Sequence, residues 1–275
     1  MNTPLINDKS SRSPLYRSAL FAFGVTAYLV GVGALVTAIL VLLGVFPFTG
    51  GPLGELRLGP ALAVDLLLLV AFAVQHSVMA RTSFKAWSAR WIPAAAERST
   101  YTLATGLVIL PMLLFWQPMP ALVWSVQAPP ARFLLLAIAV AGWSYLFVAS
   151  FAINHFELFG LEQVYQALRA RPVTPAPFRV RWMYRFDRHP IMSGMLIGLW
   201  VSPTMTVGRL LFALGCTIYI SIGVFFEQRT LRRQLGRPYE EYCGRVRSIV
   251  PTLASWRANP QPRIAPISDR SRESS

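Results

Sequence analysis

The stretch RFDRHPIMSGML, residues 185–196, places several ionisable side chains directly before an apolar run. Pro190 suits the first turn of a helix, because the N–H that proline lacks would be unpaired there anyway. A helix that begins here has free backbone N–H groups and a partial positive charge beside Arg188 and His189. Together these groups can bind a carboxylate or a phosphate. A simpler interpretation is that the arginines only mark a membrane interface.

A second set of polar residues follows the next apolar run. Glu227 supplies an anion at the end of that run, and Tyr239 and Tyr242 lie on a segment whose apolar residues recur as in an amphipathic helix. Gly194 and Gly198 form a GxxxG pair, which lets another helix or a flat ligand approach closely. The two sets therefore offer a cationic and an anionic group at the same edge of one helical hairpin.

The elements that must position these residues are six apolar runs. The runs cover residues 20–46, 61–80, 100–116, 133–153, 190–203 and 210–226. A helix needs about 20 residues to cross a bilayer, and the chain of 275 residues is 54% hydrophobic and only 14% charged. The sequence therefore predicts an all-α fold, a polytopic integral membrane bundle of about six transmembrane helices. The last two form a hairpin with a short first arm.

Lysine and arginine are distributed unevenly among the connecting segments. Twenty-three of the 26 lie on alternate segments that include both termini, and only Arg57, Arg132 and Arg209 lie on the others. Because this is the positive-inside pattern, we expect a bacterial-type inner-membrane protein with both termini and the polar site cytoplasmic. The net charge of +14 then reflects topology and contact with anionic membrane lipids. We expect no nucleic-acid partner.

Four regions are expected along the chain. They are a cytoplasmic tail (1–19), the transmembrane bundle (20–226) with a cytoplasmic loop at 154–189, an amphipathic cytoplasmic helix that closes over the site (227–257), and a Pro- and Ser-rich disordered tail (258–275). Trp116 and Trp124 are typical of an aromatic belt at the membrane surface. Cys216 and Cys243 lack disulfide or metal-ligand spacing, so we expect them to pack and expect no metal site.

Taken together, the motifs resemble a superfamily of membrane enzymes. The chain resembles the isoprenylcysteine carboxyl methyltransferases and phospholipid methyltransferases over residues 184–251, where it has Tyr184, RHPxxxG, a short hairpin, E-x-x-x-L and G-x-x-Y-x-x-Y. It departs from the usual pattern at Met192, where the superfamily has tyrosine, and at Gln228, where it has a second glutamate. QHSVMAR, ERSTY, NHFELFGL and residues 185–213 are similar to the methanethiol S-methyltransferase branch, which is related to the NnrU-like membrane proteins.

The resemblance implies a reaction and a set of binding residues. The reaction is transfer of a methyl group from S-adenosylmethionine to methanethiol, which gives dimethyl sulfide. The implied donor-binding residues are Tyr184, Arg188, His189, Pro190, Gly194, Glu227, Tyr239 and Tyr242. Arg188, His189 and the helix start would hold the donor carboxylate, and Glu227 its amino group or ribose. The tyrosines would line its adenine or close a lid.

Methyl transfer to a thiol also requires a base, because the thiolate is the nucleophile. His155 and Asp187 are the first candidates, and His76 is the second. His76 follows Asp65 by three helical turns, and ionisable residues inside a membrane usually face the bundle interior. Structural interpretations are an interfacial cap for His76, an exit cap for His155 and a local ion pair with Arg188 for Asp187.

Two other functions remain compatible with these motifs. A methyltransferase for another acceptor, such as another small thiol, a prenylated cysteine or a lipid amine, would share the donor site. A non-enzymatic NnrU-like membrane protein would need no donor site, so a failure to bind S-adenosylmethionine would favour it. The sequence does not predict an oligomeric state.

Overall fold

The structure is a computed structural model that describes residues 13–172, 182–246 and 248–249. The predicted disordered tail, residues 258–275, and most of the predicted N-terminal tail lie outside the described residues. The chain forms two compact units. The first contains Met1–Arg132, Asn154–Val173 and Ser202–Phe212, and the second contains Phe133–Ile153, Thr174–Val201 and Ala213–Ser275.

Helices dominate the described part of the chain. Within it, the helices long and apolar enough to cross a membrane are α1 (Pro14–Leu42), α2 (Leu58–Ala80), α4 (Glu97–Phe115, extended by the 3-10 turn Ala94–Ala96), α5 (Pro129–Ile153) and α9 (Val207–Leu235). A further apolar helix, α8 (Pro190–Trp200), has only 11 residues. These elements confirm the prediction of an all-α, polytopic membrane bundle whose last hairpin has a short first arm.

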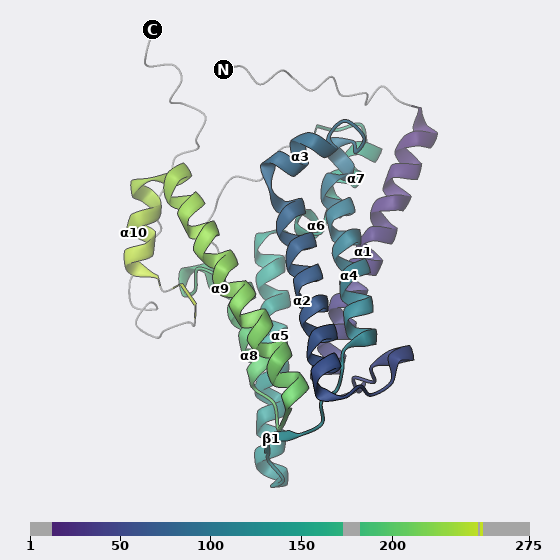
Figure 1. Ribbon diagram of the computed structural model, residues 1–275. Helices are drawn as coiled ribbons and strands as arrows, with labels where there is room; N and C mark the ends of the chain where they lie inside the picture. The colour runs from purple at the N-terminus through teal and green to yellow at the C-terminus, as the bar shows by residue number, and fades with distance from the viewer. Residues whose placement is uncertain (1–12, 173–181, 247, 250–275) are drawn as a thin grey trace. The chain divides into compact units, whose positions relative to one another are not determined.

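In the first unit, α4 lies between α1 and α2, as Figure 1 shows. Two glycines allow α1 and α4 to approach closely: Gly31 faces Thr102, and a Cβ atom on Gly106 would lie 3.0 Å from the Gly31 Cα. Small residues commonly permit such contact between membrane helices, where lipid provides no hydrophobic driving force for association. Backbone proximity therefore holds α1 and α4 together.

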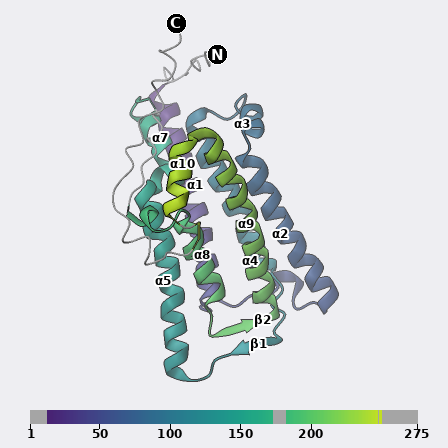
Figure 2. The same cartoon turned by 90° about the vertical axis from the view of Figure 1, so that its left-hand side faces the viewer.

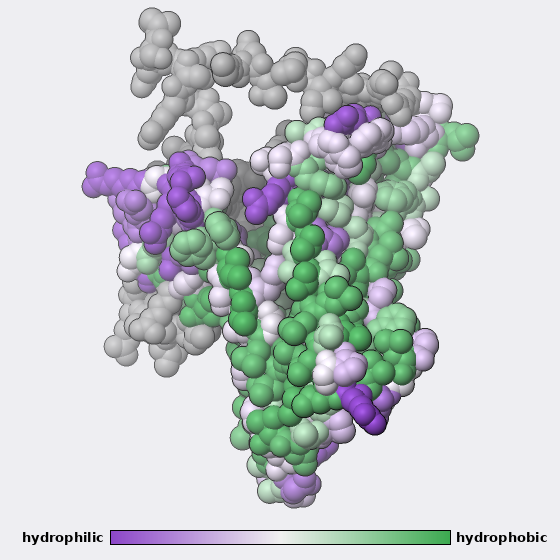
Figure 3. Space-filling model, viewed as in Figure 1, coloured by the Kyte–Doolittle hydropathy of each residue, from purple (hydrophilic) through white to green (hydrophobic). Residues whose placement is uncertain are grey.

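The outer face of α2 remains apolar. Leu67, Val70 and Val74 are all exposed, and the space-filling view shows a nearly continuous hydrophobic surface over the length of this helix (Figure 3). A large exposed apolar surface marks a membrane or protein contact. For a helix of 23 residues, lipid is the expected neighbour.

A buried carboxylate holds the segment that follows α4. Asp65 is fully buried on α2, and its Oδ1 accepts the backbone N–H of Gln117 at 2.8 Å. The predicted belt position of Trp116 is wrong, because this side chain is completely buried and donates from its indole to the Gly208 carbonyl at 3.3 Å. The indole finds its polar partner inside the first unit instead of at a membrane surface.

Two short strands follow, which were not predicted. β1 (Leu122–Ser125) pairs antiparallel with β2 (Thr204–Thr206), with Ser125 opposite Thr204. The Trp124 indole N–H donates to the Ser202 carbonyl at 3.0 Å. The pairing satisfies backbone groups in a non-helical part of the first unit.

In the second unit, α8 packs against α5, and Figure 2 shows the two helices beside the later part of α9. A Cβ atom on Gly194 would lie 2.6 Å from the Gly142 carbonyl oxygen of α5. Gly198 faces the Trp143 ring of the same helix. The close partner of the GxxxG pair is therefore another helix.

The end of α9 differs from the end of the last apolar run. The run stops at residue 226, whereas α9 continues to Leu235. Gly236, with φ 58°, then joins it to α10 (Arg237–Arg245). This φ lies in the left-handed region that glycine adopts most readily. The turn allows Tyr239, Tyr242 and Val246 to pack against Leu231, Leu235 and Cys243.

Candidate functional site

The second unit gathers most of the predicted donor-site residues around the beginning of α8. The helix begins at Pro190 with His189 as its N-cap, as the sequence predicts. The His189 N–H donates to Asp187 Oδ1 at 2.9 Å. Asp187, His189 and Pro190 are all buried. Burying polar groups is unfavourable unless they find partners. The burial of these residues therefore argues against the simpler interpretation, in which the charged residues of this stretch only mark a membrane interface.

The His189 ring lies between two residues of α9. Its Nδ1 is 3.4 Å from Glu227 Oε2, and its Nε2 is 3.4 Å from the Gln228 amide nitrogen. The Gln228 amide can donate to Nε2, and a hydrogen on Nδ1 can be donated to the Glu227 carboxylate. Gln228 also donates to the Ser248 hydroxyl. Gln228, which stands where the superfamily has a second glutamate, thus lies between the His189 ring and the Ser248 hydroxyl.

Helix α10 closes onto the residues that precede α8. The Tyr242 hydroxyl donates to the Tyr184 carbonyl at 2.5 Å, in the 3-10 turn η4 (Trp182–Arg185). The Arg188 guanidinium donates from Nη1 to Cys243 Sγ at 2.6 Å. Tyr239 and Tyr242 are both buried, and their rings lie 6.0 Å apart. The predicted tyrosines therefore form a cover over this part of the second unit.

Three buried polar atoms in this region lack a hydrogen-bond partner among the described residues. They are Asp187 Oδ2, Arg188 Nε and the Tyr239 hydroxyl. Leaving a buried polar group unpaired costs about 1–3 kcal/mol, and native proteins seldom tolerate such groups without a reason. The guanidinium and the hydroxyl can donate to an anionic ligand group, and the carboxylate oxygen can accept a proton.

Burial changes the protonation equilibria of these groups. It raises the pKa of Asp187, and hydrogen bonds from Ser193 and the His189 N–H, together with the charge of Arg188, oppose this change only in part. Burial also raises the pKa of Tyr184 and of Tyr242. The tyrosine hydroxyls therefore keep their protons at neutral pH, and the Asp187 carboxylate accepts a proton more readily than an exposed aspartate does.

Gly194, which the resemblance places in the donor site, has a clear packing role. The space that its side chain would fill is occupied by the α5 backbone at Gly142 and Leu146. Close helix packing therefore explains the glycine without a ligand. A role for Gly194 in donor binding stays a prediction.

His155 lies in the first unit, at the start of α6 (His155–Leu158). Its Nε2 is 2.9 Å from the Tyr28 hydroxyl, and the rings of Phe156 and Phe159 pack around it. Burial lowers the pKa of His155, which favours the neutral ring that can accept a proton. Tyr28 was not among the predicted residues, although a tyrosine within an apolar run of 27 residues was a signal that could have identified it.

His76 also lies in the first unit, on α2. Its Nδ1 is 3.2 Å from the Thr105 hydroxyl. The ring stacks on Phe72, with centroids 5.2 Å apart, and contacts Tyr101, with centroids 4.8 Å apart. These partners favour a structural role for His76 between α2 and α4, and its catalytic role stays a prediction.

Cys243 contacts the candidate site, although only a packing role was predicted for it. It does pack against the tyrosine cluster of α10, but its thiol also accepts the hydrogen bond from Arg188. No local motif joins residues so far apart in sequence. Among the described residues, no cluster of His, Cys, Asp and Glu has the geometry to hold a metal ion.

Comparison with known proteins finds similar chains of comparable length. The chain is 46% identical over 194 residues to methanethiol S-methyltransferase of Mycobacterium tuberculosis, covering 70% of this chain and 80% of that protein. It is 39% identical over 253 residues to methanethiol S-methyltransferase 1 of Bradyrhizobium diazoefficiens, covering 92% and 87%. It is also 32% identical over 213 residues to nurim of Rattus norvegicus, covering 71% and 81%. No protein-family profile and no solved structure matches.

Proposed function

Because the chain belongs to the methanethiol S-methyltransferase family, we propose that it transfers a methyl group to the sulfur of methanethiol, forming dimethyl sulfide. We further propose that S-adenosylmethionine is the methyl donor. The observation that carries the donor assignment is the group of three unpartnered buried atoms on Asp187, Arg188 and Tyr239. They lie in one unit, next to residues that the family resemblance assigns to donor binding.

The side chains of the second unit fit the polar groups of this donor. The free Nε–H of Arg188 and the Tyr239 hydroxyl are suited to its carboxylate, because guanidinium–carboxylate hydrogen bonds are short and strong. The Glu227 carboxylate, whose side chain is 52% exposed, is suited to its amino group or ribose. The rings of Tyr239 and Tyr242, which are tilted by 52° to each other, provide apolar faces for adenine.

When bound, S-adenosylmethionine supplies an electrophilic methyl group on a sulfonium; its carbon–sulfur bond breaks as the bond to the thiolate sulfur forms. The chain positions the charged side chains that would bind the donor, and it keeps water away from them. Arg188 is held by Cys243 and Glu227 faces His189, so both charges have defined places before the reaction. The apolar cluster of Tyr239, Tyr242 and Val246 excludes water from this region.

We propose that Asp187 is the base that accepts the proton of the methanethiol thiol. Its Oδ2 is buried and free among the described residues, while Oδ1 is engaged by the His189 N–H. The raised pKa makes the carboxylate a better proton acceptor. His155, whose neutral ring contacts Tyr28, is the alternative acceptor, and His76 is the second alternative.

The orientation that we propose has both termini and the site on the cytoplasmic side. Its support is the excess of lysine and arginine on alternate connecting segments. Residues 185–189 and 227–233, which flank the proposed site, belong to that basic set. Methanethiol, which is small and apolar, would reach the site from the lipid.

The direct test is headspace gas chromatography of purified protein with S-adenosylmethionine and methanethiol in a sealed vial. Dimethyl sulfide that scales with protein and is absent without it supports the proposal. If no dimethyl sulfide forms but calorimetry detects S-adenosylmethionine binding, the acceptor is a different molecule. If neither product nor binding is detected, the donor assignment fails and a non-enzymatic membrane role takes its place.

A further inference from the structure

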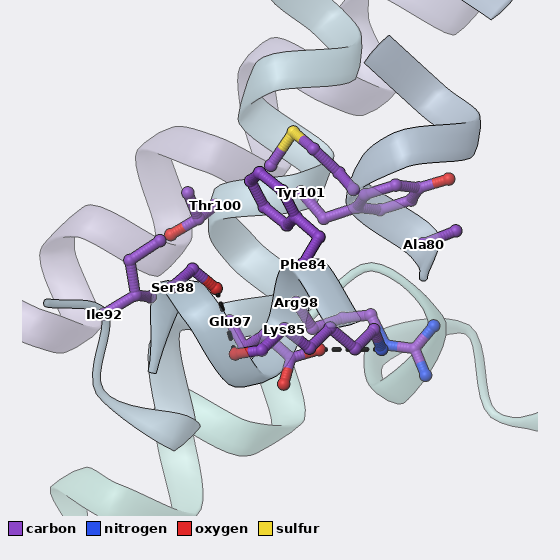
Figure 4. Close-up of a pocket in the computed structure, with 10 residues that line it drawn as sticks. Ala80, Phe84, Lys85, Ser88, Ile92, Glu97, Arg98, Thr100 and Tyr101 are labelled. Atoms are coloured by element: carbon purple, nitrogen blue, oxygen red, sulfur yellow. Dashed lines mark hydrogen bonds and ion pairs between the residues drawn. The ribbon is translucent and has the colours of Figure 1, made fainter. Parts of the chain in front are cut away.

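The first unit contains a pocket that the proposed reaction does not use. The pocket lies where α2 ends and α4 begins, beside α3 (Thr82–Ser88), and has a volume of about 180 Å³. Figure 4 shows Phe84 and Tyr101 on one side of it, and Lys85, Glu97 and Arg98 gathered on the other. The pocket is therefore amphipathic, with an aromatic wall and a charged wall.

The charged wall has an excess of one positive charge. Lys85 Nζ lies 2.7 Å from Glu97 Oε1, so these two charges neutralise each other. Arg98 is exposed and makes no ion pair or hydrogen bond from its side chain with any described residue. Its guanidinium and the remaining N–H groups of Lys85 are thus available to an anion. A phospholipid headgroup with one net negative charge, carried by its phosphodiester, suits this excess.

The surroundings of the pocket belong to a membrane surface. Trp87 and Trp91 are 49% and 63% exposed, and the Arg90 guanidinium lies 4.7 Å from the centroid of the Trp91 ring. Tryptophan is enriched where headgroups meet hydrocarbon, and arginine stacks favourably on it. Helix α3 and the residues that directly follow it therefore have the composition of a segment at headgroup level.

An apolar path leads away from the pocket along α2. Met79 lines the pocket, and Val74 and Val78 on the preceding turn are 55% and 42% exposed. The surface along this helix is mostly hydrophobic in the space-filling view (Figure 3). A ligand that fills both regions has an anionic head and an apolar tail.

We propose that this pocket binds one anionic phospholipid. The phosphodiester accepts hydrogen bonds from Arg98 and Lys85, the glycerol region lies against Phe84, and an acyl chain follows α2. Basic pockets at the ends of transmembrane helices are suited to anionic headgroups. A free phosphate would satisfy the charged wall but leave the aromatic wall uncovered, so the observations favour a lipid.

The test compares lipid retention by the full chain and two charge-matched variants. Each protein is purified in detergent and titrated with phosphatidylglycerol or phosphatidylcholine, and bound lipid is counted by native mass spectrometry. Arg98→Gln should weaken phosphatidylglycerol binding about fivefold, as expected for one cation near an anionic headgroup. Arg57→Gln removes the same charge from an exposed position just before α2, and should bind like the parent.

The result that overturns the proposal is equal phosphatidylglycerol binding by the parent and Arg98→Gln, or equal loss in both variants. Equal retention of phosphatidylglycerol and phosphatidylcholine by the parent overturns it as well. If inorganic phosphate at millimolar concentration displaces phosphatidylglycerol, the ligand is a free anion and the lipid assignment is wrong. Size-exclusion profiles and melting temperatures establish that the variants are folded. S-adenosylmethionine binding should be the same in all three proteins, so this test is independent of the proposed reaction.

Discussion

The guanidinium of Arg188 donates to the thiol of Cys243 at 2.6 Å across 55 positions of sequence. This contact joins the residue two positions before α8 to α10. It uses Nη1 and leaves Nε without a partner among the described residues. Arg188 is therefore oriented by the protein, while its Nε–H can still donate to a ligand.

Replacing either charged residue of the proposed donor site should weaken donor binding. Arg188→Ala and Glu227→Ala are each expected to raise the dissociation constant for S-adenosylmethionine by about tenfold or more, because each removes a charge-assisted hydrogen bond. Isothermal titration calorimetry in detergent measures this. Arg229→Ala, at an exposed position on α9, is the matched control. Two variants that bind like the parent would show that the donor site has been assigned to the wrong residues.

Asp187→Asn should slow methyl transfer without abolishing donor binding. The amide keeps an acceptor for the His189 N–H but cannot take the thiol proton. We expect the rate of dimethyl sulfide formation to fall by about 100-fold or more. An unchanged rate would exclude Asp187 as the base, and His155→Gln would then be the next variant, followed by His76→Gln.

Asp187→Asn should also change how the stability of the fold depends on pH. Burial raises the pKa of Asp187 above its unfolded value. Its contribution to stability is thus fully present below the unfolded pKa and is lost as pH rises through the folded pKa. Asp187→Asn should melt higher than the parent at about pH 8 and equally at about pH 3. Glu240→Gln, at an exposed position, should show no such difference between the two pH values.

Tyr242→Phe tests the cover formed by α10. The change removes the hydrogen bond to the Tyr184 carbonyl and should lower stability by about 1 kcal/mol. We expect KM for S-adenosylmethionine to rise more than kcat falls, because the hydroxyl holds the cover and does not touch the reacting atoms. Tyr165→Phe removes a hydroxyl from an exposed tyrosine on α7 (Leu161–Leu168) and is the control. Equal KM values in all three proteins would contradict a closing role for α10.

Two glycine-to-alanine substitutions distinguish the effect of close helix packing on stability from the effect of helix propensity. Gly194→Ala would place a Cβ atom 2.6 Å from the Gly142 carbonyl and 2.7 Å from the Leu146 nitrogen, so we expect a loss of about 1–3 kcal/mol from overpacking. Gly223→Ala on α9 meets no atom within 4 Å and should stabilise by about 0.5–1 kcal/mol. Thermal unfolding in detergent compares them. A Gly194→Ala protein as stable as the parent would show that α8 and α5 are not in close contact.

Hydropathy predicted the long helices but not all of their ends. The last apolar run stops at residue 226, whereas α9 continues to Leu235 because the Glu, Gln, Leu and Arg residues that follow are good helix formers. Hydropathy indicates whether a residue prefers lipid or water. The end of a helix depends instead on where its backbone hydrogen bonds stop, so the two ends need not coincide. Trp116 illustrates the same limit. Tryptophan is typical of a membrane surface, but the indole N–H of Trp116 donates to the buried Gly208 carbonyl.

Local chemistry predicted one half of the candidate site better than the other. Pro190 and His189 identified the start of α8 because proline at the first turn is a signal within a few residues. The contacts of Arg188 with Cys243 and of Tyr184 with Tyr242 join residues 55 and 58 positions apart. They depend on the turn at Gly236 and on packing of α10, and no periodicity in the sequence encodes such a pairing.

The order of these elements along the chain also orders their appearance during translation. Arg188 and Glu227 are synthesised before Gly236, and the tyrosines of α10 follow it. Proteins begin to fold from their N-terminal side while the ribosome is still adding residues. A chain that stops at Leu235 would carry every apolar helix that the structure describes and yet lack Tyr239, Tyr242 and Cys243. Synthesis of α10, after that of the apolar helices, is therefore the step that completes the contacts around Arg188.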